Sequence, residues 1–410
     1  MKRRAVIKSM GLGVAISPLA GVAFAGIGTS AADPRLVVVI LRGGMDGLAA
    51  VAPYGEANYE RARHGLALQE PGRDGGLLKL DGFFGLHPAL TNLHAMYGRR
   101  ELLVAHGVAS PYRARSHFDA QNVLELGLGA PHVAKQGWLN RALPLITPGG
   151  RTAEQHAMAL GQSVPLTLRG PVSVGSWTPD RIPDPDADTW SRIKALYAGD
   201  AFLGPKLDAA LAADDMAGVS SAGRGRPRGN PLRTLVEASA RFLSHESGPR
   251  VAVVESNGWD THVNQGANQG PLANLLGQLD EGLARLAGGL GDTWSRTAVL
   301  VVTEFGRTVA MNGTRGTDHG TAGVALVLGG AVAGGKVLGE WPGLRAADLK
   351  DGRDLAPTID VRALYLALLS QHMGADEKAL QEIVFQNARL GRAPTLVAYL
   401  CSSDWPWMPQ

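Results

Sequence analysis

The chain has 410 residues, of which 45% are hydrophobic, and its 40 basic and 37 acidic residues give a formal net charge of +3 at pH 7. Four of the basic residues and none of the acidic ones lie within residues 1–25, so the rest of the chain has a charge of −1 and lacks the basic face that nucleic-acid binding requires. The single cysteine, Cys401, excludes an intramolecular disulfide, so stability must come from a large buried core.

The N-terminus has the three parts of an export signal. Arg3 and Arg4 precede an apolar stretch that begins at Met10, and Ala23-Phe24-Ala25 is a small-x-small cleavage site. The paired arginines resemble a twin-arginine signal, which is read on proteins that are already folded. We expect residues 1–32 to be a signal and short leader, cleaved near residue 25, that directs the protein through the twin-arginine export machinery to the periplasm or the exterior. The alternative is an uncleaved N-terminal anchor.

Short apolar runs without alternation predict strands that are buried on both faces of a parallel sheet. They are Leu36–Leu41, Leu102–Ala105, Val251–Val254, Ala298–Val302 and Val324–Leu328. Between them, apolar residues at spacings of three and four predict helices. These are Pro88–Tyr97, Phe118–Leu126, Leu232–Leu243, Leu272–Leu286 and Val361–Leu369. The alternation indicates the α/β class, with a central mostly parallel sheet and helices on both faces.

One segment interrupts this alternation. We expect residues 33–410 to form a single α/β domain in which residues 144–248 are a helical insertion or cap. Prolines recur between Pro179 and Pro185, and the low-complexity segment 217–230 predicts a flexible surface loop. A cap in this position could close over a substrate.

Acidic residues and histidines gather where the predicted strands end. Ligands of open α/β sheets bind beyond the carboxyl ends of the strands. The residues that follow predicted strands are Asp46, Asp260, His262 and Glu304. A further pair, Asp318-His319, lies between Gly316 and Gly320. Carboxylate and imidazole donors on glycine-flanked turns suit a divalent cation. The sequence predicts a site for one or two ions of Zn, Mn, Mg or Ca.

The first three of these residues also have structural interpretations. Asp46 lies in a Gly-Gly-Met-Asp-Gly turn, where it could bind an ion or merely form an Asx turn. Asp260 and His262 would share one face of an extended segment and could chelate together. They could equally be a capping aspartate and a surface histidine.

Glu304 ends the most apolar strand, where a charge must be bound to a metal or paired. Arg307, three residues later, is the structural partner, although it could instead bind an anionic substrate in bidentate fashion. Adjacent Asp318 and His319 form the strongest candidate, since Asn or Ser would serve equally well in a plain turn. Its alternative is a satisfied turn histidine.

The segment from Arg115 to Asp119 could open a helix and also take part in chemistry. Ser116 would be the N-cap, with Asp119 at the capping-box position. A hydroxyl at a helix N-terminus beside Arg115 is also where an anion binds and where a metal-activated nucleophile would lie. His117 could be a ligand, a base or a core residue. Histidines in helical or apolar contexts are interpreted as structural: His87, His94, His106 and His132.

Together these motifs resemble one exported bacterial family, called domain of unknown function 1501. The motifs are Leu41-Arg42-Gly43-Gly44-Met45-Asp46-Gly47-Leu48, Arg115-Ser116-His117-Phe118-Asp119, Gly137-Trp138-Leu139-Asn140-Arg141, Gly258-Trp259-Asp260-Thr261-His262, Glu304-Phe305-Gly306-Arg307-Thr308 and Gly316-Thr317-Asp318-His319-Gly320. The resemblance covers nearly all of the chain after the signal. That family is similar to the alkaline phosphatase and sulfatase superfamily, which has a two-metal site at the strand ends of an α/β sheet.

The resemblance implies a role for each matching residue. Asp46 resembles a metal ligand, Ser116 the hydroxyl nucleophile, Asp260 and His262 one metal pair, Glu304 an acid ligand and His319 the late histidine. This chain departs from the superfamily in the short spacing of Asp260 and His262 and in having Glu304-Phe305 where Asp-His is usual. It also lacks the cysteine context of a formylglycine sulfatase.

The sequence thus predicts an exported metal-dependent hydrolase that acts on a phosphate or sulfate ester, with a small anionic ester as its substrate. Arg307 or Arg115 would bind the anion, and Ser116 would attack it. The alternative is a non-catalytic exported protein that keeps the fold and binds an envelope polymer or a partner protein.

Overall fold

The structure is a computed structural model that describes residues 33–146, 156–179, 187–217, 230–388, 390 and 393–397. The predicted signal at residues 1–32, nearly all of the predicted loop at 217–230, and Cys401 lie outside the described residues. The described residues from Pro34 onward belong to one compact unit. None of the described helices is long and apolar enough to cross a membrane.

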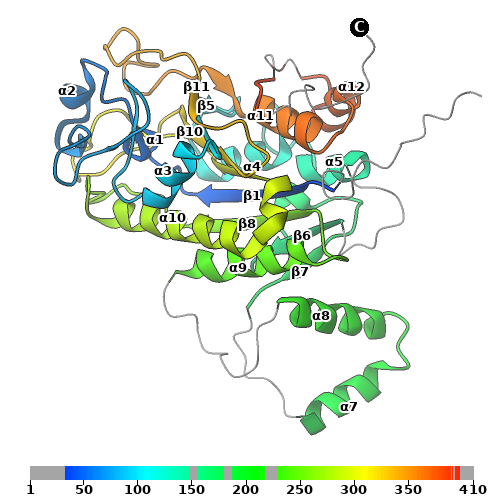
Figure 1. The fold of residues 1–410 in the computed structure, drawn as a ribbon. Coiled ribbons are helices and arrows are strands. Elements are labelled where there is room, and N and C mark those ends of the chain that lie inside the picture. The colour runs from blue at the N-terminus through cyan, green and yellow to red at the C-terminus, as the bar shows by residue number, and fades with distance from the viewer. Residues whose placement is uncertain are drawn as a thin grey trace, which may run out of the picture. The chain divides into compact units, whose positions relative to one another are not determined.

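A nine-stranded sheet is the central layer of the described residues (Figure 1). Its order is β11-β5-β10-β9-β1-β8-β6-β7, and β12 also pairs with β5. The strands are β1 (Arg35–Arg42), β5 (Leu102–Ala109), β6 (Ala157–Leu160), β7 (Gly175–Trp177), β8 (Val251–Asn257), β9 (Thr297–Thr303), β10 (Gly323–Leu328), β11 (Lys336–Leu338) and β12 (Ile359–Asp360). A small sheet joins β2 (Val51–Ala52), β4 (Gly85–Leu86) and β3 (Leu78–Lys79).

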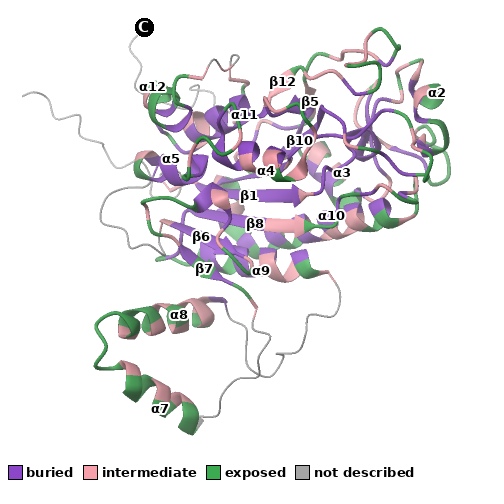
Figure 2. Ribbon diagram, turned by 180° about the vertical axis from the view of Figure 1, so that it is seen from behind, coloured by how far each residue is buried: buried purple, intermediate pink, exposed green. Residues whose placement is uncertain are grey.

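Helices cover both faces of the sheet. The described α-helices are α1 (Gly47–Ala50), α2 (Tyr59–Arg63), α3 (Thr91–Gly98), α4 (His117–Leu126), α5 (Trp138–Ile146), α7 (Ala187–Tyr197), α8 (Leu203–Ala217), α9 (Pro231–Ser244), α10 (Pro271–Leu290), α11 (Val361–Ala367) and α12 (Glu377–Ala379). Residues 37, 39 and 41 of β1 pack with α3, α9 and α10, whereas residues 36, 38 and 40 pack with α5 and α11. Figure 2 shows the strands buried between these layers. The predicted α/β class, with a central mostly parallel sheet and helices on both faces, is confirmed.

One of the five predicted strands runs against the others. β10 pairs in antiparallel fashion with both β9 and β5, while β1, β8 and β9 are mutually parallel through β1. The expectation of a parallel strand at Val324–Leu328 was therefore wrong. A parallel neighbour requires a crossover to the other end of the sheet. The chain between Thr303 and Gly323 contains no helix and re-enters the sheet from the edge at which β9 ended.

The segment at 144–248, which we expected to be a helical insertion or cap, contributes in part to the central layer. β6 and β7 continue the sheet beyond β8 as parallel strands. α9 packs on the same face of the sheet as α3 and α10. The two strands are only four and three residues long, so their sequence signal is weak. The other described helices of this segment are α7 and α8, of which α8 contacts α9 and β7.

Candidate metal centre

Three histidines and an aspartate meet at the carboxyl edge of the sheet. His117 opens α4, Asp260 and His262 follow β8, and His319 lies in the loop between β9 and β10. One donor atom from each of His117, Asp260 and His319 lies within 4.8 Å of the others, as in a metal-binding group. His262 joins them, because its Nε2 is 2.9 Å from His319 Nε2 and 3.1 Å from Asp260 Oδ1. The other carboxylate oxygen, Oδ2, is 3.4 Å from His117 Nε2.

Each of the three histidines is held through Nδ1. The partner of His117 is Glu304 Oε1 at 2.7 Å, that of His319 is the carbonyl of Arg115 at 2.8 Å, and that of His262 is Asp318 Oδ1 at 3.2 Å. An acceptor at Nδ1 places the proton there in the neutral ring and leaves the Nε2 lone pair free. Metal-binding histidines are oriented in this way.

No N–H or O–H group of the described residues donates a hydrogen bond to the Nε2 atoms of these three histidines when Nδ1 carries the proton. With Nδ1 protonated on both rings, His262 and His319 present two lone pairs to each other at 2.9 Å. His117 Nε2 is buried and has no hydrogen-bond partner among the described residues. Such an arrangement is unfavourable unless a proton or a metal cation lies between the donors. The cluster therefore fits a divalent cation.

The charges around the cluster favour an ionised aspartate. Burial alone would raise the pKa of Asp260, but the hydrogen bond and charge of Arg307 lower it below its usual value. The pKa of His319 is also lowered, chiefly by burial, which favours the neutral ring that binds a metal. The hydrogen bond that His117 donates to Glu304 raises the pKa of His117.

Arg307 organises the cluster rather than facing a substrate. Its side chain is buried, and it donates to the carbonyls of Gly43, Gly44 and Thr317 and to Asp260 Oδ1. The guanidinium is thus engaged on all sides by the protein. The prediction that Arg307 binds an anionic substrate does not agree with this position.

The glycines of the first motif allow these loops to meet. Gly43 and Gly44 have φ angles of +126° and +70°. A Cβ on Gly43 would lie 2.4 Å from the backbone nitrogen of Asp260, and one on Gly44 would lie 2.7 Å from the ring of Phe305. The two glycines thus let the end of β1 pass directly beneath Asp260.

Asp46 lies outside the cluster. It is buried and caps α1 through the backbone nitrogens of Leu48 and Ala49. Its other oxygen forms an ion pair with Arg63 at 2.5 Å and accepts a hydrogen bond from Gln265 at 2.7 Å. The structure thus places the predicted ligand Asp46 away from the histidines, with its carboxylate engaged by the cap and by Arg63.

Glu304 and Asp318 support ligands instead of joining them. Glu304 is buried, and its Oε1 accepts from the nitrogen of Gly43 and from Gln121 as well as from His117. Burial would raise its pKa, but these hydrogen bonds hold it below its usual value. Asp318 is more exposed and bonds His262 and Asn312. Both carboxylates orient histidines from outside the group, a position that differs from their predicted role as ligands.

The residues that precede His117 take different positions. Ser116 is the N-cap of α4 by backbone conformation, but its hydroxyl makes no capping hydrogen bond. Asp119, expected in a capping box, instead accepts from Tyr112 at 3.1 Å. Arg115 pairs with Asp354 and Asp351, each at 2.7 Å, so it does not reach toward an anion as predicted.

Sequence analysis missed two residues that matter here. Gln121 lies one turn after His117 on α4 and bonds Glu304, and the spacing of four could have indicated it. Arg63 neutralises Asp46 from 17 residues away, and nothing in the local pattern indicates that contact.

These features define an α/β protein with a histidine and aspartate cluster at the carboxyl edge of a mostly parallel sheet. The chain belongs to the family described as protein of unknown function (DUF1501), whose model matches residues 102–384. No curated protein matches the sequence.

Several solved structures are similar at low identity. One is Ps i-CgsB in complex with k-i-k-neocarrahexaose, with a TM-score of 0.41 and 12% identity over 85% of this chain and 74% of that one. Another is the C-terminal periplasmic domain of EcEptC from Escherichia coli, with a TM-score of 0.41 and 11% identity over 89% and 90% of the two chains. The phosphonate monoester hydrolase of Agrobacterium radiobacter has a TM-score of 0.37 and 11% identity over 83% and 74%. Likenesses at this level carry no argument about activity.

Proposed function

We propose that this protein is an exported metal-dependent hydrolase that cleaves a phosphate or sulfate ester at the cluster of His117, Asp260, His262 and His319. One observation carries the proposal: three imidazoles, each held at Nδ1, direct Nε2 toward a single carboxylate. Imidazole and carboxylate donors favour Zn or Mn over Ca or Mg, whose sites are built from oxygen.

The donor set supports one ion rather than two. The carboxylates expected to complete a second site are engaged elsewhere: Asp46 with Arg63, and Glu304 with His117 and Gln121. The first site remains accessible, since the side chains of Asp260 and His262 are 43% and 37% exposed. Water or an ester oxygen can therefore reach it.

The chain supplies the surroundings in which the ester would react. A divalent ion at the cluster would polarise the ester oxygen and lower the pKa of a bound water. Ser116 directly precedes His117, and its hydroxyl forms no capping bond, so it is the candidate nucleophile. Phe305 packs on His117 and His319 with ring centroids 4.7 and 5.0 Å apart and keeps both rings in place.

Metal analysis and ester assays test the proposal. The mature protein should retain about one ion of Zn or Mn per chain and hydrolyse an aryl phosphate or an aryl sulfate. His319→Ala should lose both properties, and Ser116→Ala should lose turnover but keep the ion. His94→Ala is the matched control, because His94 bonds the carbonyl of Lys79 away from the cluster. Wild-type protein without bound metal, or hydrolysis that survives His319→Ala, would refute the proposal.

A second candidate is a non-catalytic exported protein that binds a partner or an envelope polymer. The observation that favours it is the engagement of both candidate anion-binding residues, Arg307 and Arg115, by protein groups. A protein that binds the metal yet hydrolyses neither ester would decide for this candidate.

Export itself is proposed from the paired arginines. Changing Arg3 and Arg4 together to lysine should retain the protein in the cytoplasm in a cell-fractionation experiment. Unchanged export of the double variant would rule out the twin-arginine machinery.

A further inference from the structure

Two adjoining pockets lie along the carboxyl edge of the sheet, and Phe118, the residue after His117, lines the first of them. The inner pocket has a volume of about 440 Å³, begins at Phe118 beside His117, and is also lined by Gln121, Asn122 and Arg169. The outer pocket, of about 460 Å³, lies where β6, β7 and β8 end. Both are lined by Ser163 and Glu255, so they form one groove.

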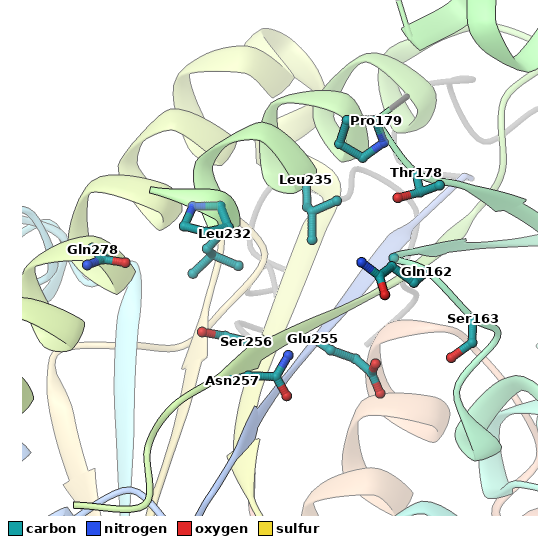
Figure 3. A pocket seen from close by; sticks show the side chains of 12 residues that line it. Gln162, Ser163, Thr178, Pro179, Leu232, Leu235, Glu255, Ser256, Asn257 and Gln278 are labelled. Atoms are coloured by element: carbon teal, nitrogen blue, oxygen red, sulfur yellow. The ribbon is translucent and has the colours of Figure 1, made fainter. Parts of the chain in front are cut away.

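The outer pocket has a polar side and an apolar side. Leu232 and Leu235 project from α9, and Gln162, Glu255 and Asn257 lie across from them (Figure 3). The side-chain amides of Asn257 and Gln278 make no hydrogen bond with any described residue. Hydrogen-bonding groups next to an apolar wall suit a ligand that has both hydroxyl groups and apolar C–H faces.

The charges of the groove compensate one another. In the inner pocket Arg42 forms ion pairs with Glu125, at 2.8 Å, and with Glu255, and it donates to Gln121. Glu255 is the one charged side chain among the described residues that line the outer pocket. In the inner pocket Arg169 donates to the carbonyl of Val164 and forms no ion pair with a described residue, so a polyanion would meet a single free cation there and not a basic row. A lipid chain would leave the amides and hydroxyls unpaired.

Phe118 gives the groove an aromatic platform. Its side chain is 86% exposed although it directly follows a residue of the cluster. The ring is therefore not part of the core, and its face is open to a ligand in the inner pocket that it lines. Sugar rings stack on aromatic side chains through their C–H faces while their hydroxyls bond to neighbouring amides.

We propose that this groove binds a neutral oligosaccharide, which would form the carrier of the ester that the cluster hydrolyses. The inference rests on the proposed function for its link to catalysis, but not for binding itself. Phe118 would stack on the sugar next to the cluster, and Asn257 and Gln278 would bond the hydroxyl or acetamido groups of sugars further along.

Calorimetric titration of the mature, metal-loaded protein tests the inference. Cellohexaose and chitohexaose are the probes, since both present neutral linked sugars, and they differ in the acetamido group. At least one should bind. Phe118→Ala should weaken it about tenfold and Asn257→Ala about fivefold, as expected for one lost stacking or hydrogen-bonding contact. Phe202→Ala is the matched control, because Phe202 is 69% exposed and lines neither pocket.

The outcomes separate this inference from the proposed function. His319→Ala should lose metal and ester hydrolysis but bind the probe within about twofold of wild type, because His319 does not line the groove. Absence of binding by both probes, or equal effects of Phe118→Ala and Phe202→Ala, would overturn the inference while leaving the metal proposal intact. Binding of hexagalacturonate in preference to both neutral probes would also overturn it.

Discussion

Two aspartates at the ends of neighbouring strands have opposite surroundings. Asp46 follows β1 and is buried, with its carboxylate neutralised by Arg63 and bonded by Gln265 and the start of α1. Asp260 follows β8, is 43% exposed, and faces three histidine Nε2 atoms. A carboxylate at a strand end is thus a ligand candidate only if the fold leaves an oxygen facing other donors. Asp260 pairs with Arg307 through Oδ1 but keeps Oδ2 toward His117.

The histidines show the same contrast. His87 and His106 donate from Nε2 to the carbonyls of Ala267 and Val51, at 2.9 and 3.1 Å, and accept a backbone N–H at Nδ1. Both ring nitrogens are satisfied in the neutral form, so these residues are structural, as the sequence predicted. In the cluster the bonds are at Nδ1, and it is Nε2 that lacks a donor. The nitrogen that remains free distinguishes the two groups.

The largest expected effect is on stability and follows from breaking the buried ion pair of Asp46 with Arg63. Arg63→Met should lower the free energy of unfolding by about 3–5 kcal/mol, because it leaves the buried carboxylate of Asp46 without its cation. Denaturant unfolding measures the change. Arg61→Met on the same helix is the control and should cost under about 0.5 kcal/mol, since Arg61 is exposed and its hydrogen bond to Asn58 lies at the surface.

A double variant sharpens this prediction. Adding Asp46→Asn to Arg63→Met should restore part of the lost stability, and the metal content of the folded protein should be the same in all variants. Loss of the bound metal in Arg63→Met would show that Asp46 belongs to the metal site after all.

The next largest effect is expected for a histidine of the metal cluster. His117→Ala should reduce metal affinity by more than about a hundredfold, because losing a ligand costs more than the 10–100-fold that follows loss of an outer partner. Competition with a chelator measures it. The stability of the metal-free protein should change little, since His117 is only half-buried. Metal affinity within tenfold of wild type would remove His117 from the site.

Local pattern was sufficient to predict much of the fold. The apolar runs at 36–41, 102–105, 251–254 and 298–302 became β1, β5, β8 and β9, because burial on both faces requires continuous apolar residues. The direction of β10 was not predictable in this way, since antiparallel and parallel neighbours in a buried sheet have the same composition. The direction of β10 depends on the segment between β9 and β10, which contains no helix that could carry the chain back to the other end of the sheet.

The location of the site could be predicted from the sequence, but the residues that compose it could not. The carboxyl ends of β8 and β9 meet in the sheet through β1, so Asp260 and His262 were expected near Glu304. Long-range contacts decide which carboxylate faces the histidines. Asp46, for example, is paired with Arg63 and does not face them. His117 depends on such a contact too, since Glu304 lies 187 residues away. Spacing along the sequence carries no information about these pairs.

A pH experiment tests the structural histidines. Burial lowers the pKa of His106 from 6.5 to about 4, so the folded protein holds this ring neutral while the unfolded chain takes up a proton below pH 6.5. Its contribution to stability is complete above pH 6.5 and is lost as the pH falls toward 4. Between pH 7 and pH 5 this one group should reduce the free energy of unfolding by about 2 kcal/mol.

The variant His106→Gln isolates that contribution. Glutamine retains a donor for Val51 and an acceptor for Gly107 but does not titrate. Unfolding measured at pH 7 and pH 5 should therefore show a shallower loss of stability than in wild type. Buried His87 and His372, whose pKa values are also lowered by burial, would account for part of the remaining loss. Equal losses in both proteins would contradict the assignment.

The smallest expected effect isolates the charge that supports the cluster. Oε1 of Glu304 accepts from Gly43, His117 and Gln121, and Oε2 accepts from Thr303. In Glu304→Gln, the amide oxygen can take the place of Oε1 and accept the same three hydrogen bonds, while the amide nitrogen takes the place of Oε2 and donates to the hydroxyl of Thr303. The substitution therefore removes the negative charge and keeps the hydrogen bonds. Metal affinity should fall by about tenfold, the lower end of the effect of an outer partner, because a neutral acceptor makes the imidazole less basic.

Glu255→Gln is the matched control, since Glu255 lies near the end of β8 and pairs with Arg42, with no hydrogen bond or ion pair to a histidine of the cluster. It should leave metal affinity unchanged. Equal losses in the two variants would mean that the general negative potential at the sheet edge holds the cation. A loss confined to Glu304→Gln would show that the negative charge of the acceptor at Nδ1 strengthens His117 as a ligand, whereas Nδ1 of His87 and His106 accepts a backbone N–H.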